Sequence, residues 1–178
     1  MSLTALQNAL PAYAEDFRKN LERLMGETLL SDQQKWGCFL ACAFASGVPL
    51  VAKAVGAETE NRLTPEAKSA AKAAAAIMGM NTVYYGAINL LTNHDYRGAP
   101  VNLAMTALTS PTVDKIDFEL WAFAVSAMSN CAACLNSHES ELHKRGVTPE
   151  RVQAALRIAA TMNAIGIVLR GEAAMAAA

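Results

Sequence analysis

Residues that favour β-strands are scarce in this sequence. Aromatic side chains make up 6% of its 178 residues, and β-branched residues are sparse beside alanine, leucine and methionine. These three residues have high helix propensity, and apolar side chains recur with helical spacing along almost the whole chain. The expected fold class is therefore all-α, and the length suits one domain with a substantial core.

The sequence also lacks an excess of charge of one sign. The formal net charge is −1 at pH 7, and the isoelectric point is about 6.3. This balance provides no electrostatic footprint for nucleic acid or for an anionic membrane surface. We therefore expect a small molecule or another protein as the partner, and neither nucleic acid nor membrane.

A signal peptide and a long uncharged apolar run are missing as well. The opening Met-Ser-Leu-Thr-Ala-Leu-Gln has no basic n-region and no long apolar core. Lys72, Glu119 and Arg157 interrupt the three most apolar segments. We expect a soluble, cytoplasmic protein. In that reducing compartment, closely spaced cysteines are more typical of catalysis or metal binding than of a disulfide scaffold.

What the sequence does contain is a compact motif between Asn130 and Gly146. Cys131 and Cys134 form a Cys-x-x-Cys pair, and His138 follows four residues after the second cysteine. Asn130 is a suitable N-cap and Gly146 a suitable C′ residue, so one helix is expected with both thiols in its first turn. The positive end of a helix dipole lowers a thiol pKa from its usual value of about 8.5.

Glu119 is the fourth candidate residue. The helix that carries it and the helix that carries the thiols are expected to form an antiparallel hairpin, turning at Ser129 and Asn130. At roughly 1.5 Å per residue, the Glu119 carboxylate then lies level with His138, about 12 to 15 Å from the turn. We expect Glu119 to orient and polarise His138, and His138 to take the proton from Cys134.

This arrangement predicts thiol-based peroxide chemistry. A peroxide would oxidise one cysteine to a sulfenic acid, and the second thiol would attack it to give a Cys131–Cys134 disulfide, which an external dithiol must reduce. No metal or flavin is required. A metal remains an alternative, because Glu119, Cys131, Cys134 and His138 are all potential ligands. Two buried structural thiols are a further alternative.

Capping residues predict where the helices begin and end. A Thr-Pro-Glu sequence opens a helix at Thr64 and again at Thr148, with a cap and a proline at N1. Expected helices cover residues 11–25, 31–47, 50–55, 64–78, 81–91, 117–128 and 130–146, with two more after Thr148 and the main loop at 93–100. Cys38 and Cys42 are expected in the core, and His94 in the loop.

The two Thr-Pro-Glu sequences also indicate an internal repeat. They lie 84 residues apart, and a shift of 85 residues aligns Asp32 and Trp36 with Asp117 and Trp121. We expect a single domain over 1–178 with two repeats of about 85 residues, the first at about 28–96 and the second at about 112–175. The first repeat has other residues at the four candidate positions: Gln34, Ser46, Pro49 and Lys53. Only the second repeat is equipped for chemistry.

Several segments resemble the alkylhydroperoxidase AhpD family within the wider carboxymuconolactone decarboxylase-like fold. They are Leu6 to Tyr13, the segments 76–85 and 118–127, and the Cys-x-x-Cys-x-x-x-His motif with the following Glu139. A glutamate, eleven residues, Cys-x-x-Cys, three residues and a histidine is a specific signature. The resemblance implies an all-helical, two-repeat subunit that assembles as a homotrimer and reduces organic hydroperoxides.

The resemblance also implies partners and roles. The dithiol would draw electrons from dihydrolipoyl groups of a 2-oxoacid dehydrogenase component and pass them to the peroxiredoxin AhpC, with no bound cofactor. Cys134 would be the thiolate activated by Glu119 and His138, and Cys131 the more exposed partner that engages the reductant. Relatives often have a histidine immediately before the second cysteine, where this chain has Ala133. The Cys131 thiolate would then depend on the helix terminus alone.

Two other functions are compatible with the same residues. One is a decarboxylase of the same fold, in which a histidine acts on a lactone acid and the cysteines are dispensable. The other is a module that senses redox state or binds a metal without turnover. Replacing Cys134 would abolish the activity of a thiol peroxidase but not that of the decarboxylase. Zinc that stays bound after purification would indicate the module without turnover.

Overall fold

The computed structural model of the protein describes residues 2–177, and every regular element in that range is helical. The expected all-α fold class is confirmed. The elements are α1 (Leu3–Asn8), the 3-10 turn η1 (Ala12–Ala14), α2 (Glu15–Met25), α3 (Asp32–Ala45), α4 (Pro49–Thr59), α5 (Pro65–Leu90), α6 (Asp95–Gly98), α7 (Thr106–Thr109), α8 (Lys115–Met128), α9 (Ala132–Lys144) and α10 (Pro149–Ala176).

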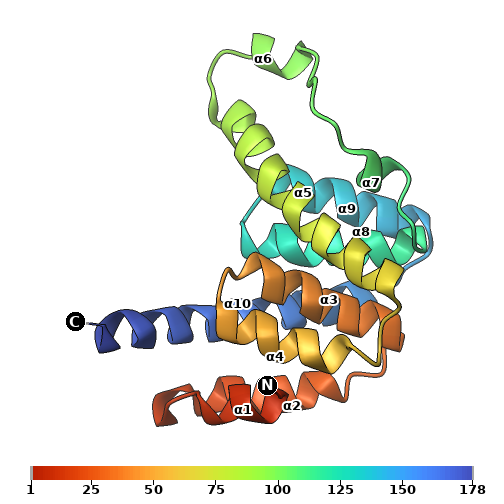
Figure 1. Ribbon diagram of the computed structural model, residues 1–178. Coiled ribbons are helices and arrows are strands. Elements are labelled where there is room, and N and C mark those ends of the chain that lie inside the picture. Colours follow the sequence, from red (N-terminus) through yellow and green to blue (C-terminus); the bar gives the residue numbers. More distant parts are fainter. Residues whose placement is uncertain (1, 178) are drawn as a thin grey trace.

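Four helices form the centre of the molecule. α3 packs against α5, α8 and α10, and α8 also packs against α5 and α10. In Figure 1, α1, α2 and α4 lie on one side of this centre, and α9 lies on the other side, next to α5 and α8. The C-terminal part of α5, with α6, extends away from the remaining helices, whereas α7 returns to pack against α5. The cysteine motif therefore lies on a hairpin formed by the central helix α8 and the outer helix α9, and α5 runs across this hairpin.

The core is densest between α3 and α8. The side chains of Phe39, Phe118 and Trp121 are completely buried there. The Trp121 indole donates its N–H to the carbonyl oxygen of Gln34 at 3.1 Å. A Cβ atom added at Gly37 would lie 2.1 Å from Trp121 Cε2, so the approach of the indole to α3 requires glycine at this position. The contact fixes α8, which carries Glu119, relative to α3.

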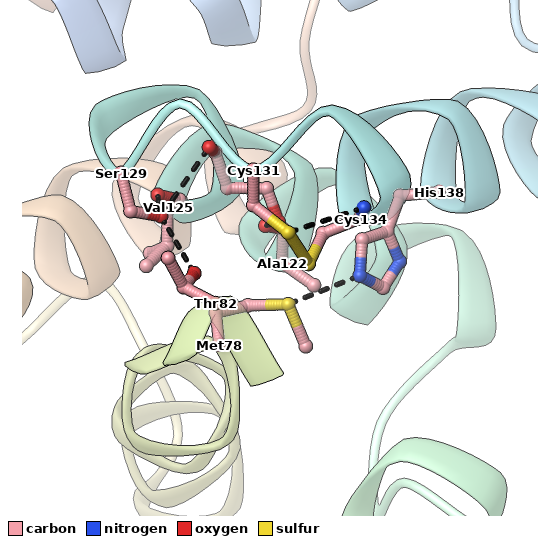
Figure 2. Close-up of a disulfide and its surroundings, with 9 residues drawn as sticks. Met78, Thr82, Ala122, Val125, Ser129, Cys131, Cys134 and His138 are labelled. Carbon is pink, nitrogen blue, oxygen red and sulfur yellow. Dashed lines mark hydrogen bonds between the residues drawn. A yellow bond between two sulfur atoms is a disulfide. The ribbon is translucent and has the colours of Figure 1, made fainter. Parts of the chain in front are cut away.

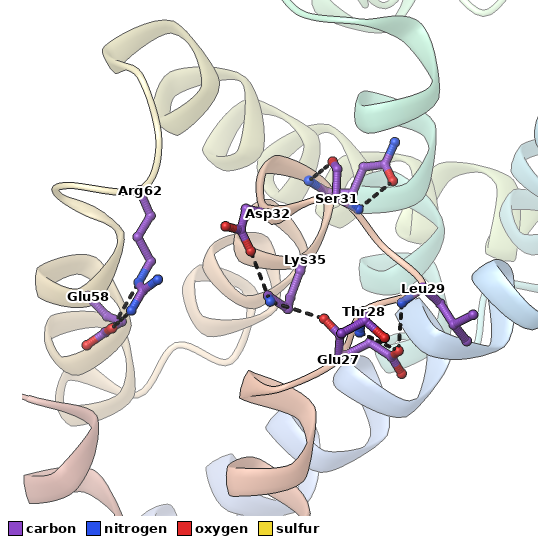
Figure 3. Close-up of polar contacts among 9 residues, drawn as sticks. Glu27, Thr28, Leu29, Ser31, Asp32, Lys35, Glu58 and Arg62 are labelled. Carbon is purple, nitrogen blue, oxygen red and sulfur yellow. Dashed lines mark hydrogen bonds and ion pairs between the residues drawn. The ribbon is translucent and has the colours of Figure 1, made fainter.

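A polar network fixes the connection between α2 and α3 (Figure 3). Ser31 caps α3 in a capping box, and the buried Lys35 ammonium donates to the Glu27 carbonyl oxygen at 3.1 Å and pairs with Asp32 at 3.0 Å. The Leu29 N–H donates to the Glu27 carboxylate, and this hydrogen bond outweighs partial burial and lowers the pKa of Glu27. The start of α3 is thus held in place.

The helix expected to end at Met78 continues for three more turns. α5 runs without a break to Leu90, so the prediction of separate helices at 64–78 and 81–91 is wrong. Glycine inside a helix, here Gly79, costs only about 1 kcal/mol relative to alanine. Packing of α5 against α8 and α9 by buried residues on both sides of this glycine offsets that cost. One continuous helix therefore spans the hairpin.

The C-terminal segment is also one helix, where two were expected. The most apolar window of α10 has a mean hydropathy of 1.5, and the helix is long enough to cross a membrane, but 56% of that window is buried inside the molecule. Burial against α2, α3 and α8 is typical of a core helix. This packing holds the segment as one helix.

Smaller differences occur in the first half of the chain. α4 continues past Gly56 to Thr59, whereas the expected helix stopped at Gly56. The expected helix over 11–25 is divided into η1 and α2, and α1 precedes it and packs against α4. The expected loop at 93–100 contains the short helix α6. At these positions tertiary packing or a local capping residue outweighs the weak preferences of the sequence for where a helix starts or ends.

The helix order is compatible with the predicted repeat. α3, α4 and α5 have 14, 11 and 26 residues, and α8, α9 and α10 have 14, 13 and 28. Thr64 and Thr148 are both N-caps followed by proline, although only Thr64 accepts a capping hydrogen bond. The organisation of 1–178 as one domain of two repeats stays a prediction.

Candidate active site

The turn between α8 and α9 positions the two cysteines. As expected, the chain reverses at Ser129 and Asn130. Asn130 is not the N-cap, however: it has a φ of +53°, a left-handed conformation that asparagine tolerates, and it makes the sharp reversal. Cys131 is the N-cap of α9, and its Sγ accepts the Cys134 N–H at 3.3 Å. The sulfurs therefore lie at the cap and in the first turn.

The other end of α9 matches the prediction. Gly146 has a φ of +75° and follows the C-cap residue Arg145, so it occupies the C′ position. The Gly146 N–H donates to the His143 carbonyl oxygen at 2.9 Å, and the Val147 N–H donates to the Leu142 carbonyl oxygen at 3.1 Å. This is a Schellman pattern, which closes the helix.

Cys131 and Cys134 are joined by a disulfide (Figure 2). Their Cα atoms are 5.3 Å apart. The exposed fractions are 4% for Cys131 and 6% for Cys134, so the expectation of a more exposed Cys131 is wrong. The reason is the fold of the hairpin: the disulfide turns both sulfurs inward, toward α5 and α8. A reductant must therefore reach a buried disulfide.

Glu119 and His138 lie in contact beside the disulfide. The Glu119 Oε2 atom is 2.5 Å from His138 Nδ1, and both residues are at least 95% buried, with exposed fractions of 3% and 5%. α8 supplies the carboxylate and α9 the imidazole, at the level that the antiparallel hairpin predicts. A buried carboxylate bound to Nδ1 fixes the ring orientation and leaves Nε2 for chemistry.

A lysine completes the environment of the carboxylate. Lys115 Nζ is 2.7 Å from Glu119 Oε1 and also donates to the Leu108 carbonyl oxygen at 2.5 Å. Burial raises the pKa of Glu119, but the hydrogen bonds and charges of His138 and Lys115 outweigh it, so the pKa lies below its ordinary 4.5. Glu119 is therefore an anion at neutral pH. Lys115 was not among the predicted site residues, although its i, i+4 spacing from Glu119 is a usable signal.

The other ring nitrogen of His138 faces α5. Nε2 is 3.1 Å from the Sδ atom of Met78, a residue that is completely buried (Figure 2). A thioether is only a weak acceptor, so Nε2 has no strong partner in the disulfide state. Met78 was not among the predicted site residues. Its contact with His138 depends on how α5 crosses the hairpin, which the sequence does not reveal.

A cavity of 390 Å³ opens beside the disulfide. Its wall contains Asn81, Tyr85, Met105, Leu108, Thr109, Ala133, Cys134, Ser137 and His138. Glu119 and Lys115 line an adjoining cavity of 410 Å³ that shares His138. Of the four predicted site residues, Cys134 and His138 thus face the main cavity, Glu119 lies behind the histidine, and Cys131 lies in neither wall. The contributions of α5 and α7 were missed.

The remaining candidates lie outside this group. Cys38 and Cys42 are completely buried, as expected, and burial raises the pKa of Cys42 to about 12. His94 precedes α6, and His143 lies in the last turn of α9. Within residues 2–177, no three His, Cys, Asp or Glu side chains converge as ligands of a metal ion.

Comparison with known proteins gives the family. Residues 95–178 match the carboxymuconolactone decarboxylase family. The chain is 55% identical over 172 residues to alkyl hydroperoxide reductase AhpD of Maricaulis maris, covering 97% of this chain and 99% of that protein. It is 51% identical over 177 residues to the Hyphomonas neptunium AhpD and 48% identical over 177 residues to the Streptomyces coelicolor AhpD, each match covering at least 98% of both chains. The chain belongs to the AhpD family of alkyl hydroperoxide reductases.

Proposed function

We propose that the protein is a thiol-dependent alkyl hydroperoxide reductase. The observation that carries the proposal is the buried Glu119–His138 pair beside a Cys131–Cys134 disulfide, with Cys134 and His138 in the wall of one cavity. A redox-active dithiol needs a base for its thiol and space for an oxidant, and this site has both. The printed names of the relatives support the same reaction.

In the oxidative half-reaction, Cys134 is the nucleophile. After reduction of the disulfide, His138 Nε2 exchanges its weak Met78 contact for the Cys134 thiol and takes its proton. The thiolate attacks the terminal oxygen of R–O–OH; the O–O bond breaks, and an S–O bond forms. The leaving alkoxide receives the proton from His138 and departs as R–OH. Glu119 stabilises the transient imidazolium through Nδ1.

In the reductive half-reaction, the disulfide forms and is broken again. The Cys131 thiol attacks the Cys134 sulfenic acid, which releases water and gives the disulfide seen in the structure. An external dithiol then opens the disulfide by two exchange steps and becomes a disulfide itself. The net change is R–OOH plus dithiol to R–OH, water and oxidised dithiol. No bound cofactor takes part.

The cavity wall favours an organic peroxide. Tyr85, Met105, Leu108 and Ala133 give it a largely apolar lining next to Cys134. An alkyl or aryl group gains hydrophobic contact there, at roughly 25 cal/mol per Å² buried, which hydrogen peroxide does not. We therefore propose alkyl hydroperoxides as the substrate class.

The burial of the disulfide favours a slender reductant. Dihydrolipoamide carries its dithiol on a flexible aliphatic chain, so it suits sulfurs that are 4% and 6% exposed better than a thiol on a folded surface does. We propose dihydrolipoyl groups of a 2-oxoacid dehydrogenase component as electron donors and the peroxiredoxin AhpC as an acceptor. Ala133 provides no base near Cys131, so thiol exchange is expected to be the slower half-reaction.

Two further properties belong to this proposal. We propose a reducing cytoplasm as its compartment, because the proposed reductants are dithiols that such a compartment keeps reduced. We also propose a homotrimer, as the family resemblance implies. Exposed apolar side chains on α5 and α10 support an interface between subunits; they are Val83, Leu90, Ile167 and Met175, with exposed fractions between 55% and 86%.

The test is consumption of tert-butyl hydroperoxide with dihydrolipoamide as the only reductant. The unmodified protein should turn over, and Cys134→Ser should reduce turnover to background. Cys42→Ala, which removes a buried cysteine outside the site, should keep most of the activity. The proposal fails if the unmodified protein is inactive although its disulfide is reduced, or if Cys134→Ser retains activity. Activity of Cys134→Ser on a lactone acid would favour the decarboxylase.

A further inference from the structure

A buried amide in the cavity wall has no partner. Asn81 is 5% exposed, and its Oδ1 atom is enclosed without a hydrogen bond to any residue in 2–177. A buried polar atom left unpaired destabilises the folded state, and such atoms in native proteins are rare. Asparagine is also a weaker helix former than alanine, which dominates α5. Asn81 is therefore unfavourable for the fold as it stands.

The position of Asn81 in α5 places it at the reacting groups. Met78, Asn81 and Tyr85 are spaced i, i+3 and i+7, so they share the helix face that lies toward α9. Met78 contacts His138 Nε2 at 3.1 Å, and Asn81 and Tyr85 line the cavity with Cys134 and His138. The Asn81 amide thus lies between His138 and the apolar part of the cavity wall.

The register of α5 at this point is fixed. Thr82, the next residue along the helix, shares a hydrogen bond with Ser129 in the turn between α8 and α9, with 2.9 Å between the two hydroxyl oxygens (Figure 2). This bond ties α5 to the segment that carries Cys131. Asn81 therefore lies on a helix that is bonded to the turn beside the disulfide, which suits a group that positions a substrate.

We infer that Asn81 binds the –O–OH group of the hydroperoxide, with Oδ1 accepting the hydrogen bond of the terminal hydroxyl. A hydroperoxide has one donor, that hydroxyl, and the cavity has one enclosed acceptor without a partner among residues 2–177. Rotation of the amide about its Cβ–Cγ bond turns Oδ1 toward the bound peroxide. The interaction directs the terminal oxygen to the Cys134 sulfur and places the alkyl group against Tyr85 and Leu108.

The inference rests on the proposed function and adds no redox step to it. The O–O bond still breaks as the thiolate attacks, and the proton on the terminal oxygen stays there and becomes the sulfenic acid hydrogen. Asn81 touches that hydroxyl before and during the attack and exchanges no proton. Its role is confined to the oxidative half-reaction, because an attacking dithiol offers no hydroxyl to hold.

The test compares the two half-reactions in Asn81→Leu, which keeps the side-chain volume and removes the amide. Pre-reduced protein is mixed with tert-butyl hydroperoxide, and loss of thiols gives the second-order rate constant. Oxidised protein is mixed with dihydrolipoamide to follow exchange. The peroxide rate constant should fall about 10- to 100-fold. The exchange rate should change less than about twofold, and the melting temperature should not fall, because an unpaired buried acceptor is removed.

Two variants keep the test decisive. Asn163→Leu is the matched control, since Asn163 lies in the wall of a different cavity, and both half-reactions should be unchanged in it. Asn81→Ala repeats the experiment if leucine disturbs folding. An unchanged peroxide rate constant, or equal slowing of both half-reactions, overturns the role of Asn81. Failure of the unmodified protein to react with peroxide instead overturns the proposed function.

Discussion

At the scale of single residues, the site is organised around the Glu119 carboxylate. One carboxylate oxygen is 2.7 Å from Lys115 and the other is 2.5 Å from His138. Glu119 itself is almost completely buried. Removing one member of such a buried group leaves the charge of the remaining members without a compensating partner. Glu119 is therefore expected to matter both for the fold and for the reactivity of Cys134.

The stability of the protein should depend on pH through this residue. The pKa of Glu119 is below 4.5 in the folded state and ordinary in the unfolded chain, so its ionised form stabilises the fold at neutral pH. This contribution is lost as the pH falls below 4.5 and through the folded pKa. Glu119→Gln should lower the free energy of unfolding by about 1–3 kcal/mol at pH 7 and by clearly less at pH 3. Urea unfolding at both pH values measures the difference.

Two comparisons make this result specific. Glu22→Gln, at an exposed position of α2, should change the free energy of unfolding little at either pH. Glu119→Gln should also raise the apparent pKa of peroxide reactivity. Without the carboxylate the protonated form of His138 is less favoured, so His138 takes the proton of the Cys134 thiol less readily. A stability difference that stays constant or grows on acidification would contradict the account, as would an unchanged pH profile of the peroxide reaction.

Sequence patterns revealed the site within one hairpin but not beyond it. The register of α8 against α9 follows from helix rise and a short turn, so the contact of Glu119 with His138 could be expected. Met78, Asn81 and Leu108 come from α5 and the α7 segment, and their approach depends on tertiary packing that no local spacing encodes. The cap residue was misassigned because Asn130 suits both an N-cap and a left-handed turn.

At the scale of elements, the packing of α3 on α8 holds Glu119 in place. Gly37→Ala adds a methyl group where the Trp121 ring lies 2.1 Å away, so the ring and α8 must shift. The free energy of unfolding should fall by about 1–3 kcal/mol, the usual cost of overpacking. Chemical unfolding monitored by tryptophan fluorescence measures it.

The matched control is another helix glycine. A Cβ at Gly56 in α4 would meet nothing within 4 Å, so Gly56→Ala should stabilise the protein by about 0.5–1 kcal/mol through helix propensity. Equal effects of the two substitutions would show that the close approach of Trp121 is not what holds α8.

At the scale of the whole molecule, the predicted repeat would place all four predicted site residues in its second half, although α5 of the first half also lines the cavity. In the first half, the corresponding positions hold Gln34, Ser46, Pro49 and Lys53. Of these, Gln34 donates to Asp117 and accepts from Arg151, which is a structural role. The all-α class followed from composition and apolar spacing. The lengths of α5 and α10 did not, because both helices continue past internal glycines that the sequence pattern presents as helix ends.

The central claim is that Cys134 attacks the peroxide and Cys131 resolves the product. The most direct measurement uses reduced Cys131→Ser, one equivalent of tert-butyl hydroperoxide and dimedone, followed by peptide mass spectrometry. Without a resolving thiol the sulfenic acid persists, so the account predicts a dimedone adduct on Cys134 and one equivalent of tert-butanol. The absence of an adduct on Cys134 while the peroxide is consumed, with Cys38 or Cys42 modified instead, would contradict it.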